Sequence, residues 1–182
     1  MRRIINSTNV SLDGLIEAME RWHYAYIDEE LSALVAEQLA DVDALLLGRR
    51  TYEGWAETWP AETGPIADKL NGMTKYVAST TLDKADWTNT SIIDSNLADQ
   101  VRKIKQQPGQ NILTYGIGPV VKELLKHDLL DEIHLSVHPI LAGTGNLSEM
   151  LFTEGLASKF ELLNTRALTS GVVVLSYRPV PH

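Results

Sequence analysis

Residues 44–52 read Ala44-Leu45-Leu46-Leu47-Gly48-Arg49-Arg50-Thr51-Tyr52, and this stretch carries most of the information on the fold. Four apolar residues in a row that end in glycine are typical of a short strand buried on both faces, as in the middle of a parallel sheet. A short helix is predicted directly afterwards, over Tyr52 to Thr58. A buried strand that leads into a helix indicates an α/β protein.

The rest of the chain continues this alternation. Hydrophobic periodicity predicts helices over 28–40, with Asp28 as N-cap, 97–106 and 119–126. Further strands are predicted over 4–9, 75–79, 91–94, 112–115, 132–139, 160–168 and 172–177. The last two form a hairpin around Ser170-Gly171. We therefore predict a mostly parallel sheet with an antiparallel C-terminal edge.

Length and composition narrow the class of protein. The 182 residues suit a single domain over 1–182, and 44% of them are hydrophobic. The net charge of −8 makes nucleic acid an unfavourable partner. We expect no membrane span, because no apolar run approaches the roughly 20 residues that one requires. The absence of cysteine excludes disulfides and cysteine-ligated zinc, so the reducing cytoplasm is the simplest location.

The strand-to-helix junction at Gly48 offers groups that suit phosphate. Helix N-termini present free N–H groups and the positive end of the dipole. Arg49 and Arg50 can bind phosphate through two hydrogen bonds each, and Thr51 can either donate to a phosphate oxygen or cap the helix. The same residues are equally typical of solvated surface charges beside an ordinary helix cap.

Two other strand ends have similar composition. Gly116-Ile117-Gly118 follows the strand at 112–115, but position 121 is valine, so the full dinucleotide fingerprint is absent. Ser79-Thr80-Thr81 follows the strand residues 75–78, and its hydroxyls could meet an adenosine phosphate, although taken alone it is more typical of an ordinary turn. Because the carboxyl ends of parallel strands meet at one edge of a sheet, where α/β proteins bind ligands, these junctions support one another.

The other residues that could form a functional site are better explained by structural roles. His134 and His138 share one face of a predicted strand, without further residues at metal-ligand spacing, so we predict no metal site and interpret both as surface or sheet-face histidines. Trp22, Trp55 and Trp59 could line a pocket for a flat ring, although aromatic residues are more often core.

Six pieces of the sequence, in this order, resemble the dihydrofolate-reductase-like proteins, and among them the C-terminal reductase domain of the riboflavin-biosynthesis deaminase/reductase. The pieces are Ser11-Leu12-Asp13-Gly14, Leu47 to Tyr52, Val77 to Leu82, Tyr115 to Gly118, Leu129 to Ile133, and Pro139 through Gly143-Thr144-Gly145 to Phe152. The resemblance implies a three-layer α/β/α fold around a mixed sheet of about eight strands.

The resemblance also implies a reductase that binds NADPH along the carboxyl edge of the sheet. Gly48, Arg49, Arg50 and Thr51 would hold phosphates, Ser79 and Thr80 would lie near the adenosine end, Gly116, Ile117 and Gly118 would contact the diphosphate and nicotinamide, and Asp13 would face a small-molecule substrate as the catalytic residue. Relatives of this kind form homodimers, and the C-terminal strands could pair with a second copy.

The chain departs from dihydrofolate reductase in one region. That enzyme has a tryptophan between prolines after its first loop, whereas residues 20–24 here contain no proline. A folate substrate is therefore not implied, and a pterin-like, pyrimidine-like or carbonyl substrate fits equally. The alternatives are a non-catalytic nucleotide-binding module that has kept the fold and, with less support, a flavin-dependent protein.

Overall fold

The computed structural model of the chain describes residues 1–143, 145–151 and 157–181. Thr144 and Phe152, which belong to the sequence pieces given above, lie outside these ranges. The strands are β1 (Ile4–Ser11), β2 (Val42–Gly48), β3 (Thr74–Ala78), β4 (Thr90–Ile93), β5 (Asn111–Tyr115), β6 (Glu132–His138), β7 (Phe160–Ala167) and β8 (Val173–Pro179). The helices are α1 (Glu29–Ala40), α2 (Arg49–Thr58), α3 (Pro65–Gly72), α4 (Leu97–Gln106) and α5 (Pro119–Lys126), and short 3-10 turns lie at η1 (Met19–Arg21), η2 (Tyr24–Tyr26), η3 (Trp59–Ala61) and η4 (Leu147–Glu149).

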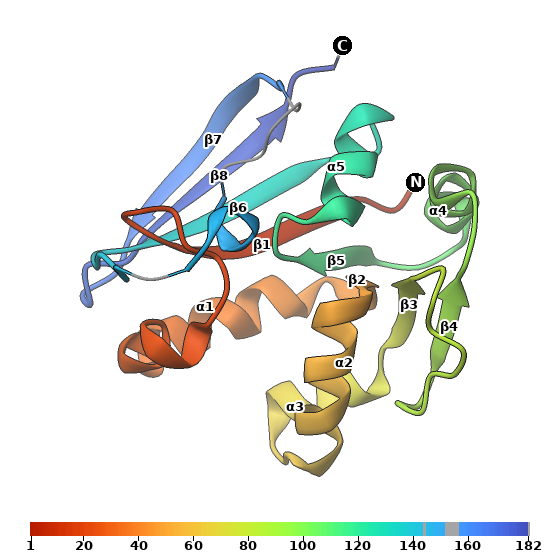
Figure 1. The fold of residues 1–182 in the computed structure, drawn as a ribbon, viewed down its shortest axis with the longest axis horizontal. Coiled ribbons are helices and arrows are strands. Elements are labelled where there is room, and N and C mark those ends of the chain that lie inside the picture. The colour runs from red at the N-terminus through yellow and green to blue at the C-terminus, as the bar shows by residue number, and fades with distance from the viewer. Residues whose placement is uncertain (144, 152–156, 182) are drawn as a thin grey trace.

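These strands form one mixed sheet in the order β4-β3-β2-β5-β1-β6-β8-β7. β1 to β6 run parallel, whereas β8 pairs antiparallel with β6 and with β7. Figure 1 shows β7 and β8 reaching beyond the helices at one end of the sheet. The predicted α/β class, the strand number and the antiparallel C-terminal hairpin are confirmed.

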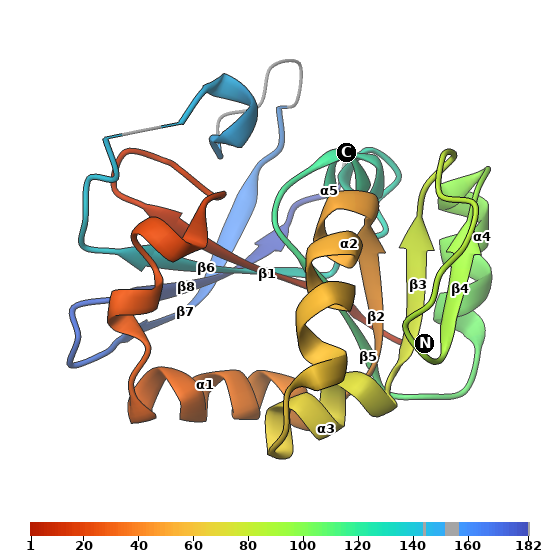
Figure 2. The ribbon, with the colours of Figure 1, turned by 60° about the horizontal axis from the view of Figure 1, so that its bottom comes forward.

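Helices cover both faces of the sheet, which makes three layers. Leu39 of α1, Tyr52 of α2 and Leu70 of α3 pack in one apolar cluster with β2, and Figure 2 shows α1 and α3 side by side. Val101 of α4 and Leu124 of α5 pack in a second cluster on the opposite face. β2 is buried from both sides because its residues 44–47 are apolar in succession.

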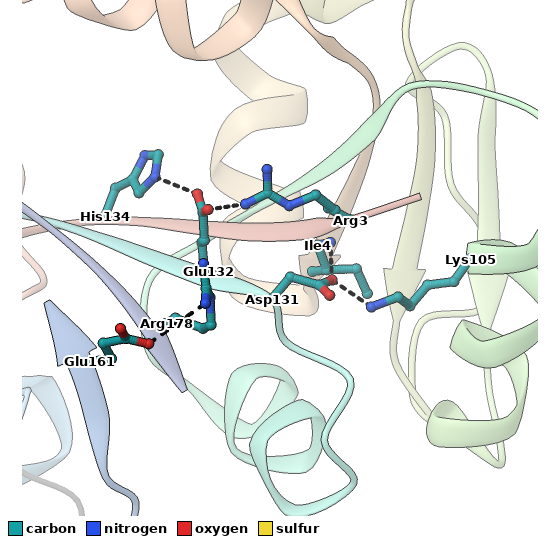
Figure 3. Close-up of polar contacts among 8 residues, drawn as sticks. All are labelled: Arg3, Ile4, Lys105, Asp131, Glu132, His134, Glu161 and Arg178. Atoms are coloured by element: carbon teal, nitrogen blue, oxygen red, sulfur yellow. Dashed lines mark hydrogen bonds and ion pairs between the residues drawn. The ribbon is translucent and has the colours of Figure 1, made fainter. Parts of the chain in front are cut away.

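Polar contacts fasten the amino edge of the sheet, where β1 and β6 begin (Figure 3). The carboxylate of Asp131 accepts hydrogen bonds from the backbone N–H of Ile4 and from Lys105 Nζ. Glu132 pairs with Arg3 and lies 3.1 Å from His134 Nε2. These ionic contacts hold the first strand against residues about 130 positions later in the chain, and they lie at the end of the sheet opposite to the predicted ligand site.

Several predicted element boundaries differ from the structure, most clearly at α2 and α3. α2 begins at Arg49, three residues before the predicted Tyr52, because Gly48 takes the extended N-cap conformation. α3 was not predicted. Of the two interpretations of His138, surface or sheet-face, the second is correct: the residue lies on a face of β6, and its side chain is fully buried. Asp28 accepts a hydrogen bond from the Leu31 N–H at 2.8 Å, which confirms its N-cap role.

Candidate ligand site at the carboxyl edge

The connections change direction between β2 and β5, which are neighbours in the sheet. From β2 the chain passes through α2 to β3, toward the β4 edge, whereas from β5 it passes through α5 to β6, toward the β7 edge. α2 and α5 lie on opposite faces. Open α/β sheets bind ligands outside the carboxyl ends of the two strands at such a switch point.

Two helix starts meet at this point. α2 has Gly48 as N-cap and α5 has Gly118, and neither helix end receives a side-chain capping hydrogen bond. A Cβ atom at Gly48 would lie 3.5 Å from Val120 Cγ2 in the first turn of α5, so the two starts are adjacent. Free N–H groups at two neighbouring helix N-termini suit an anion such as a diphosphate.

The glycines after β5 leave room beside these helix starts. Gly116 has a φ of +71°, a conformation that favours glycine, and an added Cβ at Gly116 or Gly118 would meet nothing within 4 Å. The Gly116 carbonyl oxygen accepts a hydrogen bond from Asn6 Nδ2 at 2.9 Å, which fixes the turn to β1. Ile117 lies between the two glycines and packs partly against the core. Backbone can therefore approach a ligand closely here.

Arg49 joins two of the three predicted junctions. Its Nη1 donates to Thr81 Oγ1 at 2.6 Å, and its Nε donates to Glu53 at 2.7 Å. The hydroxyl of Ser79 accepts from the N–H groups of Thr81 and Leu82, which gives the turn after β3 its shape, and Thr80 is exposed beside it. An exposed guanidinium next to exposed hydroxyls suits a phosphate at this turn.

Arg50 and Thr51, the other two polar residues of the junction at Gly48, have different surroundings from Arg49. Arg50 is exposed, and its Nη2 lies 3.9 Å from Glu17 Oε2 on the segment that follows β1. That contact connects the start of α2 to the segment that follows β1. Thr51 is in the first turn of α2, so the expectation that it caps the helix is wrong, while its donation to a phosphate stays a prediction.

Asp13 is held by backbone groups of a distant loop. Its Oδ1 accepts from the Ala142 N–H at 3.0 Å and from Ser11 Oγ at 2.5 Å, and its Oδ2 accepts from the Gly143 N–H at 2.8 Å. The bond from Ser11, followed by those from the two N–H groups, lowers the pKa of Asp13 to about 2. Asp13 is therefore ionised at neutral pH and can act as a charge or an acceptor, but not as a proton donor.

The Asp13→Asn substitution is expected to loosen this loop more than it affects cofactor binding. Asparagine keeps the size of the side chain but replaces one acceptor oxygen by a donor, which opposes the N–H of Gly143 or of Ala142. Amide hydrogen exchange at Ala142 and Gly143 should become faster, while NADPH affinity should change little. Unchanged exchange at these two amides would contradict the anchoring role. Asp128→Asn, far from this loop, is the control.

Two histidines, His138 buried and His23 half-buried, form a pair that the sequence did not indicate. His138 Nδ1 donates to the Ser136 carbonyl at 3.0 Å, so its Nε2 accepts from His23 Nδ1 at 2.9 Å. The rings of Trp22 and Tyr26 pack edge-on against His138. The pair thereby fastens the segment that follows β1 to the carboxyl end of β6.

Burial determines the charge of this pair. It lowers the pKa of His23 to about 4, with a further contribution from His138, and it lowers the pKa of His138 as well. Both imidazoles are neutral at pH 7. The sequence signal was the alternation of residues 132–138, which places His138 correctly on one face of the strand but does not reveal that α1 and the aromatic segment cover that face.

The tryptophans have mainly packing roles. Trp22 is buried. The ring centroid of Trp55 lies 4.5 Å from that of Tyr115 and 5.9 Å from that of Trp59. These partly buried rings border the apolar cluster under α2. Burial raises the pKa of Tyr115 well above its usual range. Trp55 and Tyr115 therefore form an apolar wall next to Gly116.

The part of the chain that the structure describes contains neither a candidate metal site nor a candidate membrane span. No group of three or more metal-ligating side chains could hold a metal ion. No helix within the described ranges is long and apolar enough to cross a membrane.

At the carboxyl edge of this α/β fold, two uncapped helix starts thus lie next to each other, and Arg49 contacts the hydroxyl-rich turn after β3. The chain belongs to the RibD C-terminal domain family, whose model matches residues 2–174. The uncharacterised protein YyaP of Bacillus subtilis is 29% identical over 97% of this chain and 94% of its own length. YwjB of the same organism, also uncharacterised, is 30% identical over 79% of this chain and 80% of its own.

Solved structures share the fold. A Shewanella sp. PV-4 protein named after riboflavin biosynthesis superposes with a TM-score of 0.72 and 22% identity, covering 98% of this chain and 99% of its own. A second structure is the Thermotoga maritima diaminohydroxyphosphoribosylaminopyrimidine deaminase/5-amino-6-(5-phosphoribosylamino)uracil reductase. It superposes with a TM-score of 0.66 and 15% identity, and the match covers 98% of this chain and 57% of that protein. Dihydrofolate reductase of Enterococcus faecalis, complexed with NADP(H), superposes with a TM-score of 0.61 and 15% identity, and the match covers 97% of this chain and 96% of that enzyme. The resemblance to dihydrofolate-reductase-like proteins is thus confirmed.

Proposed function

We propose that the protein is a cytoplasmic, NADPH-dependent reductase of a small heterocyclic, pterin-like or pyrimidine-like, or carbonyl substrate. The observation that carries the proposal is the meeting of the α2 and α5 starts at the switch point, with Arg49 directed to the turn after β3. The reductases among the solved structures of this fold support the same class of reaction. When bound, NADPH supplies a hydride, and the protein supplies position and electrostatics.

The residues present fit that cofactor. The N–H groups at the starts of α2 and α5 would hold the diphosphate, and Arg49 with Thr80 would hold a 2′-phosphate at the adenosine end. The open space at Gly116 and Gly118 would let the backbone come close to the nicotinamide end of the cofactor. Asp13 would fix the loops that flank the substrate and face it with a negative charge.

The proton that completes the reduction is assigned to water. Asp13 is ionised and both oxygens of its carboxylate accept hydrogen bonds from the protein, while His23 and His138 are neutral at pH 7. Because none of these three side chains is a proton donor at pH 7, we infer that a water molecule beside the substrate would supply the proton. Turnover should therefore show no titration of Asp13, His23 or His138 between about pH 7 and pH 8.

The same observation favours a second candidate, a non-catalytic module that binds the nucleotide. In that case the polar groups at the carboxyl edge of the sheet serve only to fix the loops. The two candidates differ in one measurable respect. The reductase oxidises NADPH steadily when a pterin or pyrimidine substrate is added, and the module binds NADPH without consuming it.

Thermal melting with NADPH, NADH, FMN or no ligand is the first test. A ligand that binds the native state raises the midpoint with the logarithm of its excess over Kd. We expect a larger shift with NADPH than with NADH and no shift with FMN. A folded sample that shifts with neither nicotinamide cofactor would overturn the proposal, and a shift with NADPH without oxidation across a substrate screen would favour the module.

A further inference from the structure

Asn9 is the one residue of β1 that is not buried. The strand lies inside the sheet between β5 and β6 (Figure 1), and its other seven residues are closed off from solvent. Asn9 is half-buried, although strands pair on both sides of it and helices cover both faces of the sheet. Solvent therefore reaches the interior of the sheet at this position.

The carboxamide of Asn9 has no partner within the protein. β1 contains four other polar residues, and the side chain of each is hydrogen-bonded to neighbouring groups; they are Asn6, Ser7, Thr8 and Ser11. The side chain of Asn9 makes no hydrogen bond with any residue that the structure describes. Its two N–H donors and its carbonyl acceptor are thus free to bind a ligand.

Asn9 points to the face of the sheet on which α1 lies. Ser7 lies two residues earlier on the strand, so it shares this face, and its hydroxyl is 3.3 Å from Gln38 Oε1 of α1. The helix crosses the sheet obliquely (Figure 2). Gln38, near its end, lies over β1, whereas Leu31, in its first turn, packs in one cluster with Val174 of β8. The start of α1 thereby leaves the carboxyl half of β1 uncovered.

This uncovered position lies beside the nicotinamide end of the proposed cofactor site. Ser7 is the register partner of Tyr115, and its carbonyl oxygen accepts a hydrogen bond from the Gly116 N–H at 3.1 Å. Asn9 lies one step of the pleat, roughly 7 Å, further toward the carboxyl edge. The apolar wall of Trp55 and Tyr115 stands next to it. A flat ring against this wall would turn one edge to the carboxamide.

The side chains next to Asn9 on β6 are neutral. Ser136 is its register partner, and His134 and His138 flank Ser136 on the same face of the strand. Burial lowers the pKa of both histidines, so both are uncharged at pH 7. An amidine edge, which presents two N–H donors and readily takes a positive charge, is best bound by a carboxylate. A carboxamide among neutral groups suits an uncharged edge with one donor and one acceptor.

We propose that Asn9 selects the substrate by binding a lactam edge, which is a ring N–H next to a ring carbonyl. The inference rests on the proposed function, because it assigns the ring to the reductase site. A carboxamide offers a donor and an acceptor side by side, so it forms two parallel hydrogen bonds with such an edge. Pterins and oxopyrimidines both carry a lactam, whereas a simple carbonyl compound does not. Asn9 therefore favours the heterocyclic substrates over the carbonyl compounds.

Two matched pairs of rings test this selection. Pterin and 2,4-diaminopteridine differ only in the group that replaces the ring carbonyl, and so do isocytosine and 2,4-diaminopyrimidine. With NADP+ present, the wild type should bind the oxo ring of at least one pair roughly 10-fold more tightly than its diamino partner, because a site built for a lactam is left with unpaired groups by the analogue. The pair that binds more tightly distinguishes a pterin from a pyrimidine.

Asn9→Asp should reverse the preference. The substitution keeps the shape of the side chain but leaves only acceptors, which suit the diamino ring. Asn164→Asp makes the same change at an exposed position on β7 and should keep the wild-type order. Equal affinity for both members of each pair, no binding of any ring, or an order that Asn9→Asp leaves unchanged would overturn the proposal.

A second measurement uses the wild-type protein and does not depend on the stability of Asn9→Asp. The side-chain amide signal of Asn9 in a heteronuclear NMR spectrum should move when the oxo ring is added, while that of Asn164 should stay in place. A ring that binds without moving the Asn9 signal would contradict the role of Asn9 alone. A moved Asn9 signal in a protein whose melting does not respond to NADPH or NADH would instead contradict the reductase and keep the lactam site.

Discussion

The protein is expected to lose stability steeply when the pH falls from 6.5 to 4. The pKa of His23 is about 4 in the folded protein and about 6.5 when unfolded, so between these values the unfolded chain binds the additional proton. Stability therefore decreases as pH falls through this window. The shift corresponds to roughly 3 kcal/mol for His23 at its upper limit. The lowered pKa of His138 acts in the same direction.

Chemical denaturation at pH 7 and at pH 4.5 measures this effect. In His23→Asn the amide nitrogen can still donate to His138 Nε2 but does not titrate, so the loss between the two pH values should be clearly smaller than in the wild type. His127→Asn is the matched control, because His127 pairs with Glu123 on α5, away from this cluster. An equal loss in His23→Asn and wild type would contradict the assignment.

Arg49→Ala should weaken NADPH binding by about 1–3 kcal/mol, which is about 5-fold to 150-fold in Kd. The guanidinium is exposed and points to the turn after β3, where a 2′-phosphate would lie, so its loss removes a charged hydrogen bond to that phosphate. The loss should be smaller for NADH, which lacks the 2′-phosphate. Titration calorimetry with both cofactors measures the difference.

Arg102→Ala provides the matched control for this experiment. Its side chain is 44% exposed, as is that of Arg49, and it also pairs with a carboxylate one turn away on its own helix, α4. The thermal stability of both variants should stay close to that of the wild type, because exposed ion pairs contribute little. An unchanged NADPH affinity in Arg49→Ala would mean that the phosphate binds elsewhere than at the start of α2.

Local patterns in the sequence predicted most of the architecture. The limits of α4 and α5 were correct because each has a strong apolar stripe and a clear stop or start, Pro108-Gly109 after α4 and Pro119 at the beginning of α5. α3 was missed because its apolar stripe is weak: it buries only Ala67 and Leu70, whereas α5, which has the same length, buries four apolar side chains. α2 was predicted too short, since two arginines after glycine resemble a loop until the helix start is seen.

The candidate site was predicted less completely, for a physical reason. Glycines and arginines at strand ends can be recognised locally, and parallel pairing then brings them to one edge. The contact of His23 with His138 joins residues 115 positions apart, and so does not follow from any local pattern. The same is true of Asp13, which reads as a turn residue and yet anchors residues 142 and 143.

The position of β1 in the sheet has a consequence for synthesis. Its backbone partners are β5 at 111–115 and β6 at 132–138, so the first strand emerges from the ribosome long before either neighbour. Seven of its eight residues are buried in the finished sheet. During translation β1 has no native strand to pair with, and most of the chain must be made before β1 can pair with β5 and β6 in the centre of the sheet. Such delayed pairing slows folding and exposes the nascent chain to aggregation. Chaperone binding to the first strand of the nascent chain is the expected result.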